Sequence, residues 1–488
     1  MTKLANICRR VFVALTAMFL AMTCGPLSAQ RPESFSDAVQ AVILHQDPAI
    51  IIDNVRIIDG TGRPAREGAA VLIEKGRISA IAHAGKIRKA GVLRIDAQGK
   101  TLLPGFVMMH EHLIYLDPTG SMPSYTSEHL PMPPLYLAAG TTTMRTTGTI
   151  NASDDLQVSH LINTGRVPGP RLFVTGPFVE GPGSFAYQLK PNLTADDVRL
   201  FVRYWVSAGV TSFKAYMNVS QEVLGAAIDE AHKLGASVTG HLCSVTFEEA
   251  SALGIDNLEH GLYVASDIAP DKVPDKCPSL SRADRIRLMD TDNPTVSQLI
   301  KTLVERNVAI TSTLPVFAAG LHPAIPTQES LSMLSPRSRQ MAEKRWIQFL
   351  RSGDTESMKE KRELLEKEMA FEKAFADAGG TLLVGTDPTG WGGTVPPNST
   401  HAALILLVEA GFTPLEAISL ATQTGARFLG VADQIGTIEA GKNADLVLVN
   451  GAPDENIENV QNVVMVFRDG VAYDPEALIA GVRGKVGR

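Results

Sequence analysis

Residues 235–260 read GASVTGHLCSVTFEEASALGIDNLEH, and this stretch decides the fold. A short apolar strand ends at His241, a helix follows, and a second apolar strand closes the stretch. Thr246 and Glu249 form a capping box at the start of the helix, and Gly254 lies just past its end. A strand, a helix and a strand in this order predict that the two strands pair in parallel.

The same module recurs on both sides of this stretch. Four further copies are expected at residues 140–145, 209–214, 307–313 and 380–387. Two more strands are expected at residues 102–112 and 171–176. Together with the two strands in 235–260 they make eight, and eight strand–helix units are typical of a closed barrel. We therefore predict an α/β fold with a (β/α)8 TIM barrel over residues 104–431.

The two ends of this region are rich in short strands without a helical period between them. Glycines separate apolar runs at 50–58, 70–74 and 77–82, and two similar runs return at 445–449 and 463–467. Two strand-rich ends around a long middle indicate one domain assembled from both. We predict a small β-sandwich domain built from both termini, residues 49–103 and 432–475.

Residues 1–29 have the composition of a signal peptide. Three basic residues precede the apolar run 11–22, and Leu27-Ser28-Ala29 resembles a small-residue cleavage site. No later run reaches the roughly 18 apolar residues of a membrane-spanning helix. We expect a periplasmic or secreted protein with no membrane attachment after signal cleavage. Loss of the three basic residues would take the formal net charge from −7 to −10, which argues against nucleic acid as a partner.

Six polar side chains stand where the predicted strands end: His110, His112, Lys214, His241, His260 and Asp387. The C-terminal ends of all strands in a parallel barrel lie on one rim, so these groups should converge. Residues i and i+2 of a strand face the same way, so the first two histidines can bind one cation together. Each residue alone has a structural explanation, but six on one rim favour a site for zinc or a similar divalent metal.

Several motifs resemble the metal-dependent amidohydrolase superfamily. They are the opening Pro-Gly…His-x-His (103–112), the segment that carries a carboxylated lysine in hydantoinase-like members (212–217), and three motifs similar to the imidazolonepropionase-like and prolidase-like branch (258–261, 385–387 and 436–446). The resemblance covers residues 50–474. Glu111 and Pro388 depart from the family pattern, which has a small or apolar residue and an alanine there more often.

The resemblance implies a binuclear site in which carboxylated Lys214 bridges two divalent metal ions, expected to be zinc. One ion would be held by His110, His112 and Asp387, and the other by His241 and His260. The alternative for the lysine is a protonated amine that pairs with Glu111 or Glu259 in a site for one metal.

The predicted function is that of an enzyme, an amidohydrolase acting on C–N (amide-type) bonds of a small molecule such as a dipeptide or an N-acyl amino acid. Attack by metal-bound hydroxide would open the bond, and Asp387 would pass the proton to the leaving nitrogen. Two alternatives stay open: a cyclic amidase similar to hydantoinase or imidazolonepropionase, and a non-catalytic ligand-binding barrel.

Further expectations concern residues around this site. Arg145, at the end of a strand, is predicted to bind a substrate carboxylate, with a salt bridge at the rim as the alternative. Tyr216 shares the inward face with Lys214 and is predicted to contact substrate, with barrel core as the alternative. Whether Cys243 and Cys277 pair is left open. The long insertion 314–379 is a lid or a solvated surface segment, and a homo-oligomer is expected.

Overall fold

The structure is a computed structural model that describes residues 32–117, 124–184, 186–322, 325–352, 355–390 and 394–487. The predicted signal peptide, residues 1–29, lies outside the described residues. Within these ranges no helix combines the length and the apolar character that a membrane crossing requires.

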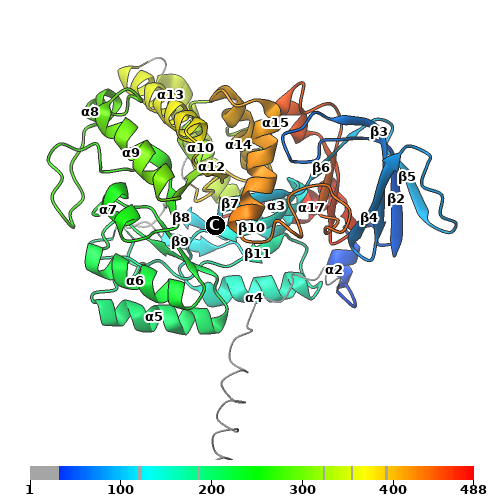
Figure 1. The fold of residues 1–488 in the computed structure, drawn as a ribbon, viewed down its shortest axis with the longest axis horizontal. Coiled ribbons are helices and arrows are strands. Elements are labelled where there is room, and N and C mark those ends of the chain that lie inside the picture. The colour runs from blue at the N-terminus through cyan, green and yellow to red at the C-terminus, as the bar shows by residue number, and fades with distance from the viewer. Residues whose placement is uncertain are drawn as a thin grey trace, which may run out of the picture.

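Eight parallel strands, counted among the described residues, form the centre of the larger part of the molecule (Figure 1). One sheet contains β7 (Phe106–Glu111), β10 (Thr141–Thr146) and β11 (Arg171–Phe173). The other contains β12 (Ser212–Ala215), β13 (Ser237–Gly240), β14 (Asn257–Glu259), β15 (Ala309–Ser312) and β16 (Leu382–Val384). All neighbouring pairs in both sheets are parallel. The α/β class and the parallel pairing are therefore confirmed.

Backbone hydrogen bonds also link the edges of these two sheets. Gly176 N donates to Ser212 O at 2.8 Å, and Thr386 N donates to His110 O at 3.1 Å. The strand pairs themselves still fall into two sheets, so closure into one barrel is not detected in the strand pairing.

Helices alternate with these strands, and their ends follow the sequence signals. Thr246 with Glu249 forms the predicted capping box, and Thr413 with Glu416 forms another. Each box satisfies backbone donors that a helix start leaves unpaired. The helices between the strands are α3 (Met132–Ala138), α4 (Ala152–Asn163), α5 (Ala195–Ala208), α6 (Gln221–Lys233), α7 (Phe247–Ala252), α9 (Pro294–Glu305), α14 (Asn398–Glu409), α15 (Pro414–Ser419) and α16 (Gly425–Phe428).

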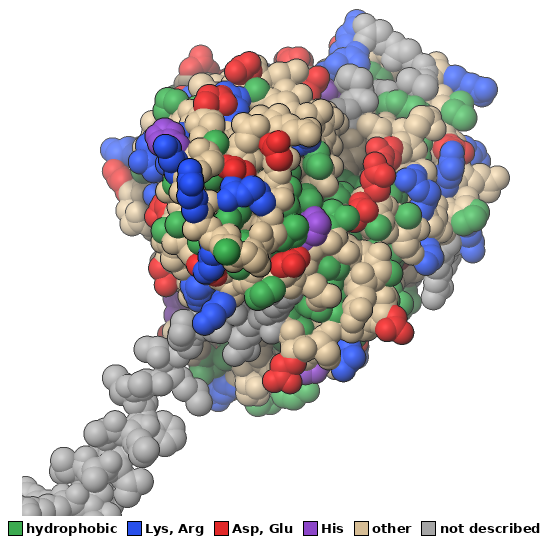
Figure 2. All heavy atoms as spheres, turned by 90° about the vertical axis from the view of Figure 1, so that its right-hand side faces the viewer, with side chains coloured by type: hydrophobic (Ala, Val, Ile, Leu, Met, Phe, Trp, Pro, Cys, Tyr) green, Lys and Arg blue, Asp and Glu red, His purple; other side chains and the backbone are tan. Residues whose placement is uncertain are grey.

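A further sheet, which we call the composite sheet, combines strands from both ends of the chain, coloured blue and red in Figure 1. Its order is β1 (Ile43–His45), β19 (Val471–Tyr473), β18 (Val463–Arg468), β17 (Leu446–Val449), β6 (Thr101–Pro104), β2 (Ala49–Ile57), β3 (Arg66–Glu74) and β4 (Arg77–His83), with β5 (Leu93–Asp96) paired to β2. The hydrogen bonds join these strands into a single sheet, so the predicted sandwich is not confirmed. Figure 2 views the molecule from this side and shows acidic and basic side chains interspersed on that face.

The predicted strand at 102–112 is two strands that belong to different sheets. β6 joins the composite sheet and β7 the parallel one, with Gly105 between them. A Cβ at Gly105 would lie 2.1 Å from Thr142 Oγ1, so only glycine fits at this crossing. The sequence pattern is continuously apolar here because both strands are buried.

The insertions contain further helices. Residues 264–294 include α8 (Arg282–Leu288), and residues 314–379 include α10 (Leu314–Ala318), α11 (Gln328–Met333), α12 (Pro336–Ser352) and α13 (Glu356–Asp377). A hairpin of β8 (Ile114–Asp117) and β9 (Ser124–Ser127) follows the first parallel strand. A disulfide joins Cys243 and Cys277, which answers the question left open by the sequence and ties the first insertion to the loop after β13.

Candidate active site

The predicted strand-end side chains meet in one place. Nε2 of His112 and Nε2 of His110 lie 3.2 and 3.5 Å from the same oxygen, Oδ1 of Asp387. The ligand atoms of these three residues lie within 4.8 Å of one another, so together they could hold a metal ion. The ring of His260 lies 4.7 Å from that of His110 and 4.5 Å from that of His241. The structure thus places all four histidines and the aspartate side by side.

Lys214 joins this group from β12. Its Nζ lies 3.2 Å from His110 Nε2, and its side chain is buried. Burial lowers the pKa of Lys214 to about 8, although the negative charges of Glu259 and Asp387 act in the opposite direction. Lys214 therefore loses its proton at a lower pH than an exposed lysine does.

Neighbouring groups fix the orientation of three imidazole rings. His110 Nδ1 lies 2.6 Å from Glu259 Oε2, and His112 Nδ1 lies 3.0 Å from the carbonyl oxygen of Gly148. His260 Nδ1 lies 2.7 Å from the hydroxyl oxygen of Thr313. Each contact uses one ring nitrogen and leaves the other for a cation, which is the usual arrangement of metal-binding histidines.

The electrostatics of the site favour neutral imidazoles and an ionised aspartate. Burial lowers the pKa of His112, lowers that of His260 well below its usual range, and lowers that of His241 to about 3. Burial alone would raise the pKa of Asp387, but the interactions with His110, the hydrogen bond from His112 and the charge of His260 hold this pKa well below the usual range. Neutral imidazole and carboxylate are the protonation states that bind a metal.

Glu111, which departs from the family pattern, is buried behind the ligands. Its Oε2 accepts a hydrogen bond from Thr386 Oγ1 at 2.6 Å. Burial raises the pKa of Glu111 to about 8, although its neighbours Thr386 and Tyr136 act in the opposite direction. Tyr136 also donates to the carbonyl oxygen of His112 at 3.0 Å. The carboxyl group therefore supports the backbone between two ligands, and the structure does not pair it with Lys214.

A pocket of about 260 Å³ opens onto these groups. Its lining residues are His112, Ile114, Tyr125, Phe178, Lys214, Tyr216, His241, His260, Asp387 and Thr389. Tyr216, predicted to contact substrate, is among them, and its ring lies 4.9 Å from the ring of His241.

Arg145 requires a correction, because the structure places it away from this pocket. Its Nη2 donates to Asn257 Oδ1 and Glu259 Oε1, both at 2.8 Å, and its Nε donates to the carbonyl oxygen of Met109 at 2.9 Å. The side chain is only 1% exposed. Arg145 neutralises the buried Glu259 that orients His110, so the structure favours the alternative of a salt bridge, which is buried at the strand ends, over a carboxylate clamp.

Sequence reasoning missed the residues that orient ligands and the aromatic side chains of the pocket. For Glu259 the available signal was its position, because an acidic residue there directly precedes the predicted ligand His260. Tyr125 and Phe178 lie in segments that carry no motif, and only the folded chain brings them to Lys214.

Residues 101–472 match the sequence profile of the amidohydrolase family. The chain belongs to the amidohydrolase family. The resemblance inferred from the motifs is thereby confirmed, and so is the class of enzyme at the level of the family, hydrolases of carbon–nitrogen bonds.

Individual relatives agree with this assignment. The chain is 38% identical to the S-triazine hydrolase of Gordonia rubripertincta over 78 residues, which are 15% of this chain and 16% of that protein. The match thus spans about a sixth of the length of that curated relative. A solved Xaa-Pro dipeptidase with bound methionine in its active site has a TM-score of 0.63 and 20% identity, covering 87% of this chain and all of that one. A bottromycin amidohydrolase has a TM-score of 0.69 and 21% identity, covering 92% of each chain. At these identities the two structures show a shared fold.

Proposed function

We propose that this protein is a metal-dependent hydrolase of an amide-type C–N bond in a small molecule. The observation that carries the proposal is the group of His110, His112 and Asp387, whose ligand atoms lie within 4.8 Å of one another beside a pocket. Family membership supports the same reaction class. A non-catalytic barrel would be expected to lack some of the ligands, and all the predicted ones are present and adjacent.

We further propose two divalent ions, with zinc as the metal. His110, His112 and Asp387 would hold one ion and His241 with His260 the other, with carboxylated Lys214 between them. The donor set of neutral imidazoles, a carboxylate and a buried lysine beside His110 fits such a site. When bound, the metal would supply Lewis acidity for the substrate carbonyl and for the attacking water.

The chain itself supplies positioning and proton transfer in this proposal. Asp387 is ionised and lines the pocket, so it can take a proton from the attacking water and return it to the leaving nitrogen. Glu259 and Thr313 hold the rings of His110 and His260 in place. A cavity of about 260 Å³ is below the roughly 300–1,000 Å³ typical of ligand pockets, which favours a small substrate.

Several wider features belong to the same proposal. We propose that the eight parallel strands form one closed (β/α)8 barrel and that the composite sheet folds into a sandwich. We also propose export to the periplasm or the medium after removal of residues 1–29, and a homo-oligomeric state. The hydrogen bonds that link both edges of the parallel sheets support the first of these.

The experiment that tests the metal site compares the parent protein with Lys214→Ala. Elemental analysis of the parent should find about two divalent ions per chain. Lys214→Ala should lose one ion and most activity, because the bridge is gone, and short carboxylic acids should partly restore both. The matched control is Lys233→Ala, an exposed lysine of α6.

Two results would contradict the proposal. An active preparation without metal would refute metal dependence. Full activity and full metal content in Lys214→Ala would refute the bridge and leave a site for one metal around His110, His112, His260 and Asp387.

A further inference from the structure

The pocket has a polar side and an aromatic side. The rings of Tyr125, Phe178 and Tyr216, which we call the aromatic wall, line it together with Ile114. The ring of Phe178 lies 5.0 Å from that of Tyr216, in an edge-to-face arrangement. Two hydrogen bonds join the backbone of Tyr125 to the side chain of Gln188 and hold this part of the wall in place. Tyr125 N donates to Gln188 Oε1 at 2.8 Å, and Gln188 Nε2 donates to Tyr125 O at 3.3 Å.

Cations for a substrate carboxylate are scarce in this pocket. Among the described lining residues, Lys214 is the only lysine or arginine, and it faces His110 at 3.2 Å. Arg145 is buried outside the pocket, and its Nε and Nη2 are directed to Glu259, Asn257 and Met109. The stretches 118–123 and 391–393 contain neither lysine nor arginine in their sequence.

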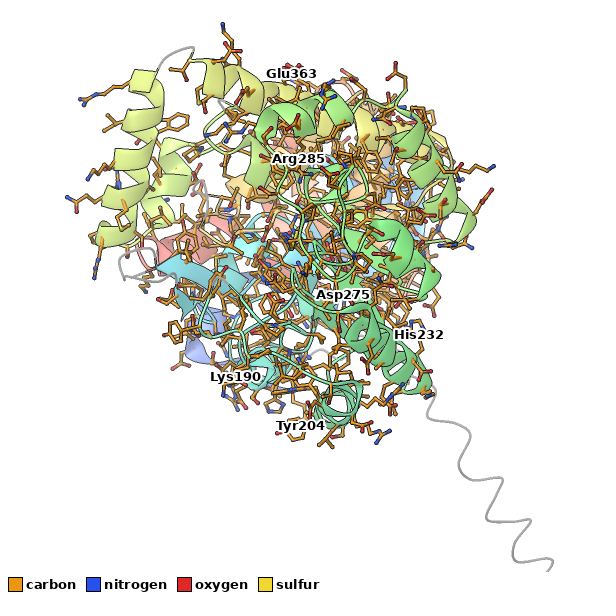
Figure 3. All side chains as sticks on the ribbon, turned by 90° about the vertical axis from the view of Figure 1, so that its left-hand side faces the viewer. Lys190, Tyr204, His232, Asp275, Arg285 and Glu363 are labelled. Atoms are coloured by element: carbon orange, nitrogen blue, oxygen red, sulfur yellow. A yellow bond between two sulfur atoms is a disulfide. The ribbon has the colours of Figure 1, made fainter. Side chains whose placement is uncertain are left out.

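Another cation, Lys190, belongs to a different cavity. Lys190 lines a separate space of about 390 Å³, which shares only Phe178 with the catalytic pocket. In Figure 3, Lys190 lies on the lower part of the molecule near Tyr204. The ring of Phe178 therefore forms a wall common to the two cavities, and the described lining of the catalytic pocket does not include Lys190.

We infer that the substrate is an uncharged amide with an aromatic group beside the scissile C–N bond, and not an N-acyl amino acid or a dipeptide. This inference rests on the proposed hydrolytic function. A carboxylate placed against the aromatic wall would lose its hydration without gaining a cationic partner, which is strongly unfavourable. An aromatic ring there would gain edge-to-face contacts and bury apolar surface. A carboxylate in this pocket would interact mainly with the metal-binding groups, and there it would inhibit the enzyme.

Two matched pairs of compounds test the inference on the metal-loaded enzyme. N-acetylphenethylamine and N-acetylphenylalanine differ by a carboxylate with the ring on the amine side. N-ethylbenzamide and N-benzoylglycine differ similarly with the ring on the acyl side. In at least one pair, the neutral compound should have a kcat/KM at least about 10-fold higher than the acid. Isothermal titration calorimetry of the same compounds gives their affinities independently of turnover.

Variants of Phe178 sharpen the test. Phe178→Ala should weaken binding of the neutral aromatic amide by about 10-fold while metal content stays the same. Phe178→Lys, which adds a cation to the pocket, should shift the preference toward the acids. Tyr187→Ala is the matched control, because this tyrosine comes from the same segment and is 66% exposed.

Each outcome separates the inference from the proposed function. Faster hydrolysis of the acids in both pairs would overturn the inference and leave the hydrolase function standing. Binding of the neutral amides without hydrolysis would uphold the inference and overturn the function. If the metal-loaded protein neither binds nor hydrolyses any of the four compounds, both fall.

Discussion

Two pocket residues, His260 and Asp387, have their backbone in the left-handed region, with φ of 68° and 51°. His260 directly follows β14, and Asp387 lies three residues beyond the end of β16. This conformation is costly for a residue with a Cβ and persists where the surroundings enforce it, often at functional sites. At Asp387 it turns the chain so that the backbone N–H donates to His110 O at 3.0 Å while the carboxylate faces His110 and His112.

Replacement of Asp387 by asparagine tests its role as the proton carrier. The variant keeps an oxygen that can bind metal and tolerates the same backbone conformation. We expect turnover to fall by about 10²–10⁴-fold, because the base is lost, while metal content changes little. Steady-state kinetics and elemental analysis measure both, with Asp377→Asn, on an exposed helix end, as the control. An unchanged turnover across the pH range would exclude this role.

The site residues that stand at the end of a predicted strand could be predicted from the sequence, and the other site residues could not. His110 and His112 alternate along one strand, and parallel strands bring Lys214 and Asp387 to the same rim, so position in the sequence was sufficient. Arg145 also ends a strand, but its long side chain turns inward to the buried Glu259. No local pattern announces such a partner 114 residues away. The aromatic wall depends on how loops fold back, which periodicity does not encode.

At the scale of elements, α13 packs two glutamates against the catalytic part. Glu368 and Glu372, one turn apart, are both buried, and Glu368 Oε2 accepts a hydrogen bond from Tyr263 N at 2.7 Å. Burial raises the pKa of Glu372 to about 8, although Ser312 acts in the opposite direction, and burial raises the pKa of Glu368 well above its usual range. Arg285 of α8 acts in the opposite direction on the pKa of Glu368, and Figure 3 shows Arg285 below Glu363, a residue of α13. The insertion 314–379 thus contains a packed helix, and a role of the insertion as a lid stays a prediction.

The glutamate pair makes stability depend on pH. The folded state holds the proton of Glu372 up to about pH 8, whereas the unfolded chain releases it near 4.5. The stabilisation is complete below the unfolded value and is lost as the pH rises through this window. Glu372→Gln cannot ionise, so its Tm should fall less between pH 5 and 8 than that of the parent. Thermal unfolding at several pH values checks this, with exposed Glu366→Gln as the control; equal slopes in all three proteins would contradict it.

At the scale of the whole molecule, one buried arginine links the composite sheet to the parallel sheet of β7, β10 and β11. Arg171 at the start of β11 donates to Asp445 Oδ2 and to Asp469 Oδ1, both at 2.8 Å, and to Thr143 Oγ1 at 3.1 Å. Both aspartates belong to the C-terminal part of the composite sheet region. The alternation of strands and helices predicted the two kinds of sheet, but a contact between residues nearly 300 positions apart has no signature in a single sequence.

Removal of this arginine should separate the two parts. Arg171→Met leaves Asp445 and Asp469 buried without a cation, which typically costs about 3–5 kcal/mol. We expect a clearly lower denaturant midpoint, and partial recovery when both aspartates are also changed to asparagine. Arg166→Met, at an exposed position, is the control. An unchanged midpoint in Arg171→Met would show that the link does not stabilise the fold.

The composite sheet also constrains how the chain can be made. β1 pairs with β19, so the first described strand needs a partner that the ribosome delivers roughly 430 residues later. At the usual elongation rate of about 5–20 residues per second, the wait is roughly 20–90 s. During this time β6, which is made soon after β2, β3 and β4 and pairs with β2, has an open edge where β17 will later pair, and open edges invite pairing with other chains. Nascent chains of this protein should therefore need protection by a chaperone until translation is complete.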